Sequence, residues 1–240
     1  MTLVKQLAQL KADIQTHAAL QQSGPETVKI VAVTKHASTR QMLEAFDCGL
    51  RDFGENKQQD AEAHMQALAQ YLSPEAFSQI HWHFIGHLQS NKVSKIIGKF
   101  DLIHSVDSVR LAQKISEAAT AQGITQEILL QVNVSGEQSK GGIAPVAMRD
   151  ALIAVSAMPG LQLCGLMAMA PLSDDPEIPQ AVFRELFLLR KTLESMSTAD
   201  FRGSLPELSM GMTKDYVPAL QNGATIIRVG TLLFGENTGQ

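Results

Sequence analysis

Short apolar segments alternate with helical patterns along the chain. The segment 28–34, VKIVAVT, is rich in valine and isoleucine, which is typical of a strand buried on both faces. Segments of this kind predict eight strands, at 28–34, 52–54, 80–85, 101–105, 127–134, 161–168, 207–210 and 225–229. Helical patterns lie between them, with expected bounds 40–48, 57–69, 91–97, 108–121, 146–157, 181–196 and 215–221. This alternation predicts an α/β protein with a parallel sheet.

The number of strands favours a closed sheet. Eight parallel strands close a TIM barrel, and such barrels are typically about 250 residues long. The rival is a doubly wound open sheet, which usually carries a glycine-rich phosphate loop after its first strand. Here the first strand runs into VAVTKHAS, without that loop. The sequence therefore predicts a single (β/α)8 TIM barrel with an extra N-terminal helix.

The N-terminal segment predicts the extra helix. Apolar residues recur at helical spacing with charged residues between them: Leu3, Leu7, Leu10, Ile14 and Ala18. A signal peptide would need an unbroken apolar region instead, and no run approaches the roughly 18 apolar residues of a membrane span. We expect one domain over 1–240, with the helix at about 2–20 and the barrel at about 28–236.

Composition narrows the function classes. The formal net charge is −4, whereas nucleic-acid binding usually shows as a basic patch. Cys48 and Cys164 stand among apolar neighbours and read as small buried hydrophobes. So few cysteines suit a reducing compartment. We expect a cytoplasmic protein that binds neither nucleic acid nor membrane and is a monomer or a weak dimer.

Lys35 is the first candidate for chemistry. It follows the first strand directly, and barrel active sites form where the strands end. A lysine held at the barrel mouth can form a Schiff base with an aldehyde. The alternative is a surface lysine at the rim.

The ends of the seventh and eighth strands predict an anion site. Ser209 to Thr213 reads SMGMT, and Gly230 precedes Thr231, so both ends offer hydroxyls beside a glycine. TIM barrels often bind phosphate in these two loops, and a helix that begins near Lys214 would add its N–H groups. The alternative is a pair of ordinary glycine turns.

Arg228 interrupts an otherwise apolar strand, TIIRVG. A charge there is seldom fully buried without a partner. In a cofactor site, an arginine that faces a pyridine nitrogen would disfavour its protonation. The alternative is a structural ion pair on the outer face of the barrel.

A different functional class, the metal-dependent hydrolase barrels, is suggested by three histidines: His81, His83 and His87. Zinc needs at least three protein ligands, and the other candidates are His104 and Asp107 near the fourth strand. We expect no metal, with His81 structural and His83 facing the site, and keep the hydrolase as an alternative.

Eight motifs together resemble a known family. They are VAVTK (31–35), FGENK (53–57), WHFIGHLQSNK (82–92), SVDS (105–108), QVNVSGEQSKGG (131–142), GLMAMAP (165–171), LSMGMTKDY (208–216) and IIRVGTLLFGE (226–236). In this order they resemble the pyridoxal phosphate homeostasis protein family, also called the YggS/PROSC family. The likeness covers nearly the whole chain.

The resemblance implies a barrel of the alanine racemase N-terminal type that carries pyridoxal 5'-phosphate (PLP). Lys35 would hold the cofactor as a Schiff base, and Arg228 would lie near its pyridine nitrogen. The phosphate would be held by Ser209, Gly230 and Thr231, with Thr213 where serine is more usual. Asn56 and His83 would make further contacts.

The resemblance also implies a role in PLP supply and vitamin B6 homeostasis without strong catalysis, with PLP-dependent apo-enzymes as partners. Alanine racemases add a C-terminal domain that bears a catalytic tyrosine. Because the chain stops at Gln240 and has only Tyr71 and Tyr216, we expect no such domain. A PLP-dependent amino-acid racemase remains the alternative. Lys140 could bind a second anion or simply be a solvated loop lysine.

Overall fold

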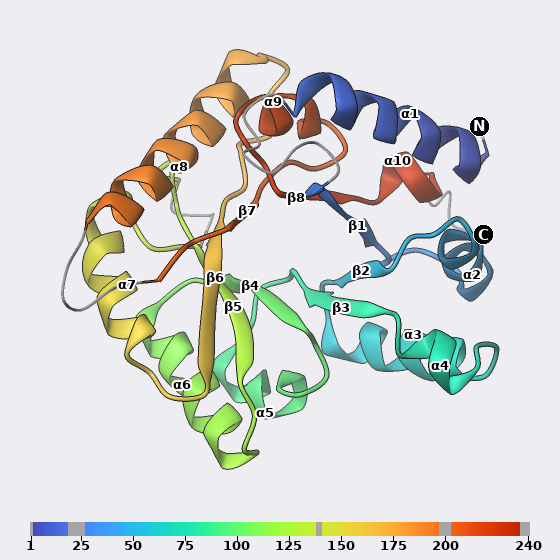
Figure 1. The fold of residues 1–240 in the computed structure, drawn as a ribbon, viewed down its shortest axis with the longest axis horizontal. Coiled ribbons are helices and arrows are strands. Elements are labelled where there is room, and N and C mark those ends of the chain that lie inside the picture. Colours follow the sequence, from blue (N-terminus) through green and yellow to red (C-terminus); the bar gives the residue numbers. More distant parts are fainter. Residues whose placement is uncertain (1, 19–26, 138–140, 197–202, 236–240) are drawn as a thin grey trace.

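The computed structural model describes residues 2–18, 27–137, 141–196 and 203–235. Its centre is a closed barrel in which eight parallel strands follow one another in chain order, with the helices outside (Figure 1). This closure confirms the TIM barrel and rules out the open sheet. Residues 19–20 of the expected N-terminal helix, residue 236 of the expected barrel and Lys140 lie outside the described residues, and the bounds of the domain stay a prediction.

All eight predicted strands are present. Their bounds are β1 Lys29–Val33, β2 Asp52–Glu55, β3 His81–Phe84, β4 Leu102–Val106, β5 Gln126–Gln131, β6 Leu161–Met167, β7 Glu207–Ser209 and β8 Ile226–Val229. The barrel closes between β1 and β8, which pair in parallel from Lys29 opposite Ile226 to Ala32 opposite Val229.

Helices fill the connections. The main ones are α2 Thr39–Asp47, α3 Gln58–Ala69, α5 Val93–Ile96, α6 Val109–Ala121, α7 Met148–Ser156, α8 Glu177–Ser195 and α9 Tyr216–Gln221. Two helices were not predicted, α4 (Pro74–Phe77) and α10 (Thr231–Phe234), because four residues are too few to show a helical period. Helix α8 begins four residues earlier than expected, since Pro179 lies in its first turn, where a missing N–H costs nothing.

Side chains alternate between the two faces of the barrel wall. Val31 belongs to a small apolar cluster whose members come from five different strands and meet inside the barrel: Val31, Leu102, Leu129, Cys164, Met167 and Ile226. Its neighbours Ile30 and Ala32 belong to the larger core cluster with the helices. With a period of two, Val33 and then Lys35 continue the inward-facing row, which leads to the mouth of the barrel.

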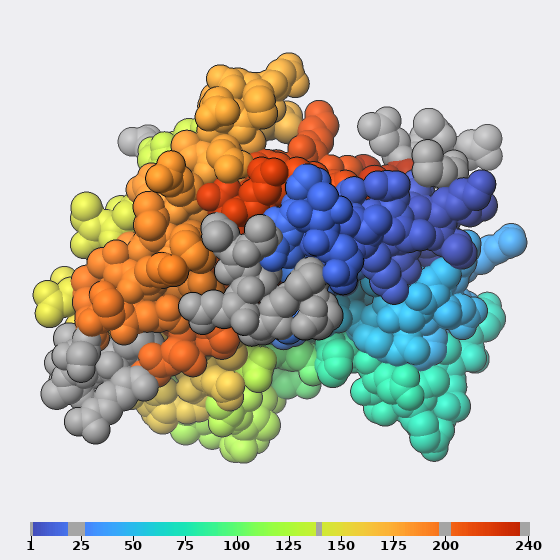
Figure 2. Space-filling model, turned by 45° about the horizontal axis from the view of Figure 1, so that its top comes forward, coloured from blue at the N-terminus to red at the C-terminus, as the bar shows by residue number. Residues whose placement is uncertain are grey.

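Helix α1 (Leu3–His17) packs against α9 and α10, so the N-terminal segment lies beside the C-terminal one (Figures 1 and 2). The predicted apolar face is the buried one, and burying each leucine or isoleucine contributes about 1.5–3 kcal/mol. The Tyr216 hydroxyl also donates to Asp13 at 2.6 Å. Among the described residues, no helix is long and apolar enough to cross a membrane.

Candidate functional site

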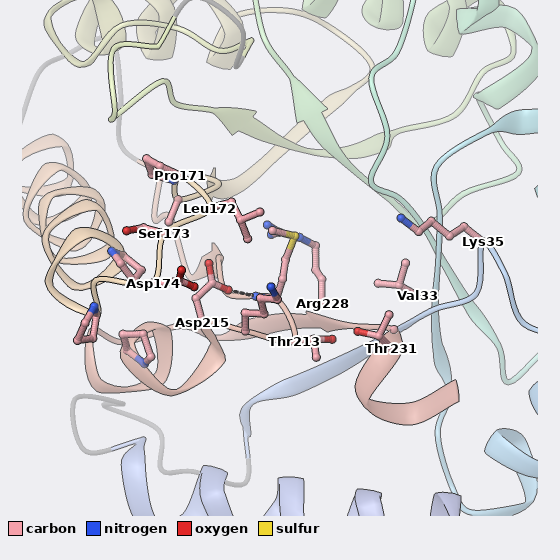
Figure 3. A pocket seen from close by; sticks show the side chains of 17 residues that line it. Val33, Lys35, Pro171, Leu172, Ser173, Asp174, Thr213, Asp215, Arg228 and Thr231 are labelled. Atoms are coloured by element: carbon pink, nitrogen blue, oxygen red, sulfur yellow. Dashed lines mark hydrogen bonds between the residues drawn. The ribbon is translucent and has the colours of Figure 1, made fainter. Parts of the chain in front are cut away.

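A cavity of about 400 Å³ opens at the carboxyl ends of β1, β6, β7 and β8. It brings together five of the residues that the sequence singled out: Lys35, Thr213, Arg228, Gly230 and Thr231. In Figure 3 the Lys35 side chain points toward the Arg228 side of the cavity, and Thr213 and Thr231 both line it. We refer to this space as the carboxyl-end cavity.

Two loops complete its wall. The loop after β6 contributes Ala170 to Asp174, and the loop after β7 contributes Met212 to Asp215. The first loop was not among the candidate site residues predicted from the sequence. The only signal was its place after a strand end, because the segment PLSDDPEIP itself carries no chemical motif.

The turn that bears Lys35 is anchored from behind. Lys35 itself is exposed. The hydroxyl of the preceding Thr34 reaches the Gly54 carbonyl at 3.2 Å and the Glu55 carboxylate, and His64 of α3 contacts the same carboxylate at 2.6 Å. The hydrogen bond to Glu55 raises the pKa of His64, although partial burial works against it. Glu55 therefore faces the helices, and the Lys35 side chain is free to extend over the cavity.

Glycines shape the turns after β7 and β8. Gly211 has φ +89°, and a Cβ there would lie 2.6 Å from the Ala219 side chain. A Cβ on Gly230 would lie 3.2 Å from Val33. The Thr213 hydroxyl accepts a hydrogen bond from the Leu232 N–H at 3.4 Å, which links the two turns. Close backbone packing thus gathers hydroxyls and main chain at one end of the cavity, where the sequence predicted an anion site.

Arg228 faces the barrel interior and not the outside, so its reading as an outer-face ion pair is wrong. It is 4% exposed, donates to Ser209 Oγ and donates to the Ala168 carbonyl at 3.1 Å. Burial lowers the pKa of Arg228 to about 10, although the charge of Asp215 opposes this shift. The guanidinium therefore remains a cation at neutral pH.

Three of the residues predicted for the cofactor do not line this cavity. Ser209 is fully buried beneath it, in contact with Arg228. Asn56 lines a separate pocket of about 260 Å³. His83 lies inside the barrel and borders an opening at the amino ends of the strands. Their contacts to a cofactor stay predictions.

The histidines do not converge. His81 pairs with Asp101 at 3.8 Å, and His87 pairs with Asp107 at 3.5 Å. Within the described ranges, no group of three His, Cys, Asp or Glu side chains could hold a metal ion. This geometry gives the hydrolase alternative no support.

Comparisons with known proteins agree with the fold. Residues 6–238 match the family described as "Alanine racemase, N-terminal domain". Two relatives named "Pyridoxal phosphate homeostasis protein" come from Aquifex aeolicus and Pseudomonas aeruginosa. The first is 36% identical over 98% of this chain and 99% of its own, and the second 38% identical over 98% and 95%. The structure of PipY from Synechococcus elongatus with PLP bound is similar, with a TM-score of 0.81 and 34% identity over 98% of this chain and 100% of that one.

Proposed function

Because this chain belongs to the family of pyridoxal phosphate homeostasis proteins, we propose that it binds PLP in the carboxyl-end cavity, with Lys35 linked to the cofactor as a Schiff base. The observation that carries the proposal is the convergence of Lys35, Arg228 and the two hydroxyl-bearing turns on one cavity. PLP supplies an aldehyde that reacts with amines. Its size suits the cavity volume of about 400 Å³.

The residues present fit the two ends of PLP. Thr213, Gly230 and Thr231 offer hydroxyls and close-packed main chain for a phosphate, in the loops where TIM barrels often bind one. Lys35 and Arg228 reach the remaining space. In this arrangement Thr213 and Thr231 would bind the phosphate, Lys35 would hold the aldehyde carbon and Arg228 would lie near the ring nitrogen.

The proposed role is PLP homeostasis without strong catalysis. Arginine only donates hydrogen bonds, so Arg228 favours an unprotonated ring nitrogen, which accepts electron density poorly. A racemase also needs an acid–base group on each face of the carbanion. Both tyrosines of the sequence are described and neither lines the cavity, and the Tyr216 hydroxyl is bound to Asp13. Burial raises the pKa of Tyr216 to about 12, so this hydroxyl stays protonated at neutral pH and does not act as a base there.

We propose PLP-dependent apo-enzymes as recipients of the cofactor. The cavity rim presents Leu172 and Met212, apolar side chains that are 82% and 39% exposed, as a surface for contact with such partners.

We place the role in the cytoplasm, and Cys48 and Cys164, both free, suit its reducing conditions. A monomer or a weak dimer suffices, since the cavity is complete in one chain.

Absorption spectroscopy tests the proposal. Stoichiometric PLP added to the ligand-free protein should give a Schiff-base band in the near-ultraviolet to violet. Adding L-alanine in deuterated water should then change the spectrum without rapid exchange of the Cα proton. If no Schiff-base band forms, the proposal that the protein holds PLP on a lysine is wrong. Exchange of the Cα proton or formation of D-alanine at about 1 s⁻¹ or faster would favour the racemase alternative.

A further inference from the structure

Polar side chains from five different strands form a continuous row through the barrel interior. Asp52 Oδ1 lies 3.0 Å from His83 Nε2, and His83 Nδ1 lies 2.9 Å from His104 Nε2. His104 Nδ1 lies 2.7 Å from Ser209 Oγ. Arg228 donates to the same oxygen. This interior chain begins at Asp52 in the amino-end opening and ends at Arg228 in the wall of the carboxyl-end cavity.

The interior chain is shielded from solvent except at its start. The side chain of Asp52 is 23% exposed, whereas His83 and Arg228 are almost fully buried and His104 and Ser209 are fully buried. Buried polar groups require hydrogen-bond partners, and here each group finds its partner in the next one. A change at Asp52 can therefore be passed on only through these contacts or through the backbone.

The hydrogen bonds of the interior chain have one consistent direction. Burial, the neighbouring His83 and the positive charge of Arg228 lower the pKa of His104 well below its usual value, so this ring is neutral and has one N–H. Arginine only donates and a carboxylate only accepts. With His83 Nε2–H donating to Asp52, His83 Nδ1 accepts from His104 Nε2–H. His104 Nδ1 then accepts from the Ser209 hydroxyl, which accepts from Arg228, and no group is left unpaired.

In this direction the Ser209 hydrogen points to His104. The same direction turns a lone pair of Ser209 toward Arg228. The charge of Asp215 acts on Arg228, and Arg228 takes part in none of the ion pairs described for the other residues. The carboxylate at the far end of the row is Asp52, and aligned hydrogen bonds polarise one another in a low-dielectric interior.

We propose that Asp52, His83 and His104 are positioning residues, which act through Ser209 to hold the Arg228 guanidinium at the wall of the carboxyl-end cavity. The amino-end opening is thereby coupled to the cavity on the opposite face. The effect on PLP rests on the proposed function, whereas the direction of the interior chain is a property of the ligand-free protein.

Nitrogen-15 NMR of the histidines in the ligand-free protein tests the direction. Both His83 and His104 should carry their proton on Nε2. Asp52→Ala should remove the fixed tautomer of His83, whereas Glu127→Ala, which removes another carboxylate of the same opening, should not. Asp52→Leu, which also removes the acceptor, serves if the alanine variant does not fold. A proton on His104 Nδ1, or equal spectra for the Asp52 and Glu127 variants, would overturn the proposal.

A double-mutant cycle on PLP affinity tests the coupling. Asp52→Ala should raise the dissociation constant by about threefold to tenfold, as for the loss of one hydrogen bond in a network. In a Ser209→Ala background the same change should have almost no effect, because the interior chain is already broken. Equal effects in both backgrounds would overturn the coupling, since distant and unlinked sites normally add. If the native protein does not bind PLP at all, the proposed function fails and the NMR result alone decides on the interior chain.

Discussion

One lysine begins strand β1 and another follows it, and the two differ in their ion pairs and in the cavity that they line. Lys29 starts the strand at the amino-end opening and binds Glu207 at 2.7 Å. Partial burial works to lower the pKa of Lys29, but Glu207 and the nearby carboxylates outweigh it and raise that pKa. Lys35 follows the strand at the carboxyl-end cavity, and no ion pair of the described residues includes it.

The carboxylates of the two barrel ends explain this difference. At the amino end, Glu207 at the start of β7 pairs with Lys29, which lines the opening. At the carboxyl end, the buried Glu55 is bound by Thr34 and by His64 of α3, away from Lys35. The amino-end opening is the larger space, about 580 Å³ against 400 Å³. The lysine at the mouth, and not the volume, therefore distinguishes the proposed cofactor site, because it is in an ion pair at the amino end and in none of those described at the carboxyl end.

The largest expected effect is at Lys35. Lys35→Ala should abolish the Schiff-base band with PLP, because the proposed amine is gone, and the barrel should remain folded. Lys29→Ala, the matched control at the other end of β1, should keep the band. Absorption spectra and thermal unfolding of both variants measure this, and a full band in Lys35→Ala would show that another lysine reacts.

Strand β8 offers a second matched pair, Thr225 before it and Thr231 after it. Thr231→Val should weaken PLP binding by about 1.5–3 kcal/mol, the cost of one hydrogen bond to a charged group, and leave pyridoxal binding unchanged. Thr225 donates to Glu207 at 2.5 Å and accepts from the Leu208 N–H at 2.8 Å. Thr225→Val should therefore lower stability without changing PLP affinity. If Thr231→Val weakens the binding of PLP and of pyridoxal equally, the phosphate is not bound by the turns after β7 and β8.

Breaking the pair at the amino end should have a smaller effect. Lys29→Met removes a partly exposed ion pair, which is worth roughly 0–1 kcal/mol of unfolding free energy. Chemical denaturation measures this change, and PLP affinity should stay at the native value. A clear loss of PLP affinity would mean that the two ends are not chemically distinct in the way their ion pairs indicate.

The smallest expected effect depends on pH. The folded-state pKa of His64 is raised above its usual value of 6.5, mainly by the hydrogen bond to Glu55. Its stabilisation is therefore fully present below about pH 6.5 and is lost as the pH rises through the raised pKa. The free energy of unfolding of His64→Gln should lack this decline. Denaturation from pH 6 to 9 compares the two proteins, and parallel curves would contradict a charged His64–Glu55 pair.

The sequence predicts the barrel well because most strands are apolar segments that alternate with helical patterns. Lys35, Thr213, Arg228, Gly230 and Thr231 reach one cavity because parallel strands end at the same face.

The interior chain could not be predicted in the same way. The strands of His83 and His104 each contain a second polar residue, His81 and Ser105. The sequence gives neither the distance between His83 and His104 nor the contact of His104 with Ser209. The short β7 staggers Ser209 so that it lies below the cavity and not in its wall, opposite Ile226. The sequence also did not predict that the loop after β6 lines the cavity, because the position of this loop depends on packing and not on a local sequence pattern.

The most direct test of the account is to locate the lysine that holds PLP. The native protein, mixed with one equivalent of PLP and reduced with borohydride, is digested and mapped by mass spectrometry. The account predicts that the phosphopyridoxyl group is on the peptide that contains Lys35, and that the peptide with Lys29 is unmodified. A label mainly on Lys29, or spread evenly over surface lysines, would contradict a cofactor site at the carboxyl-end cavity.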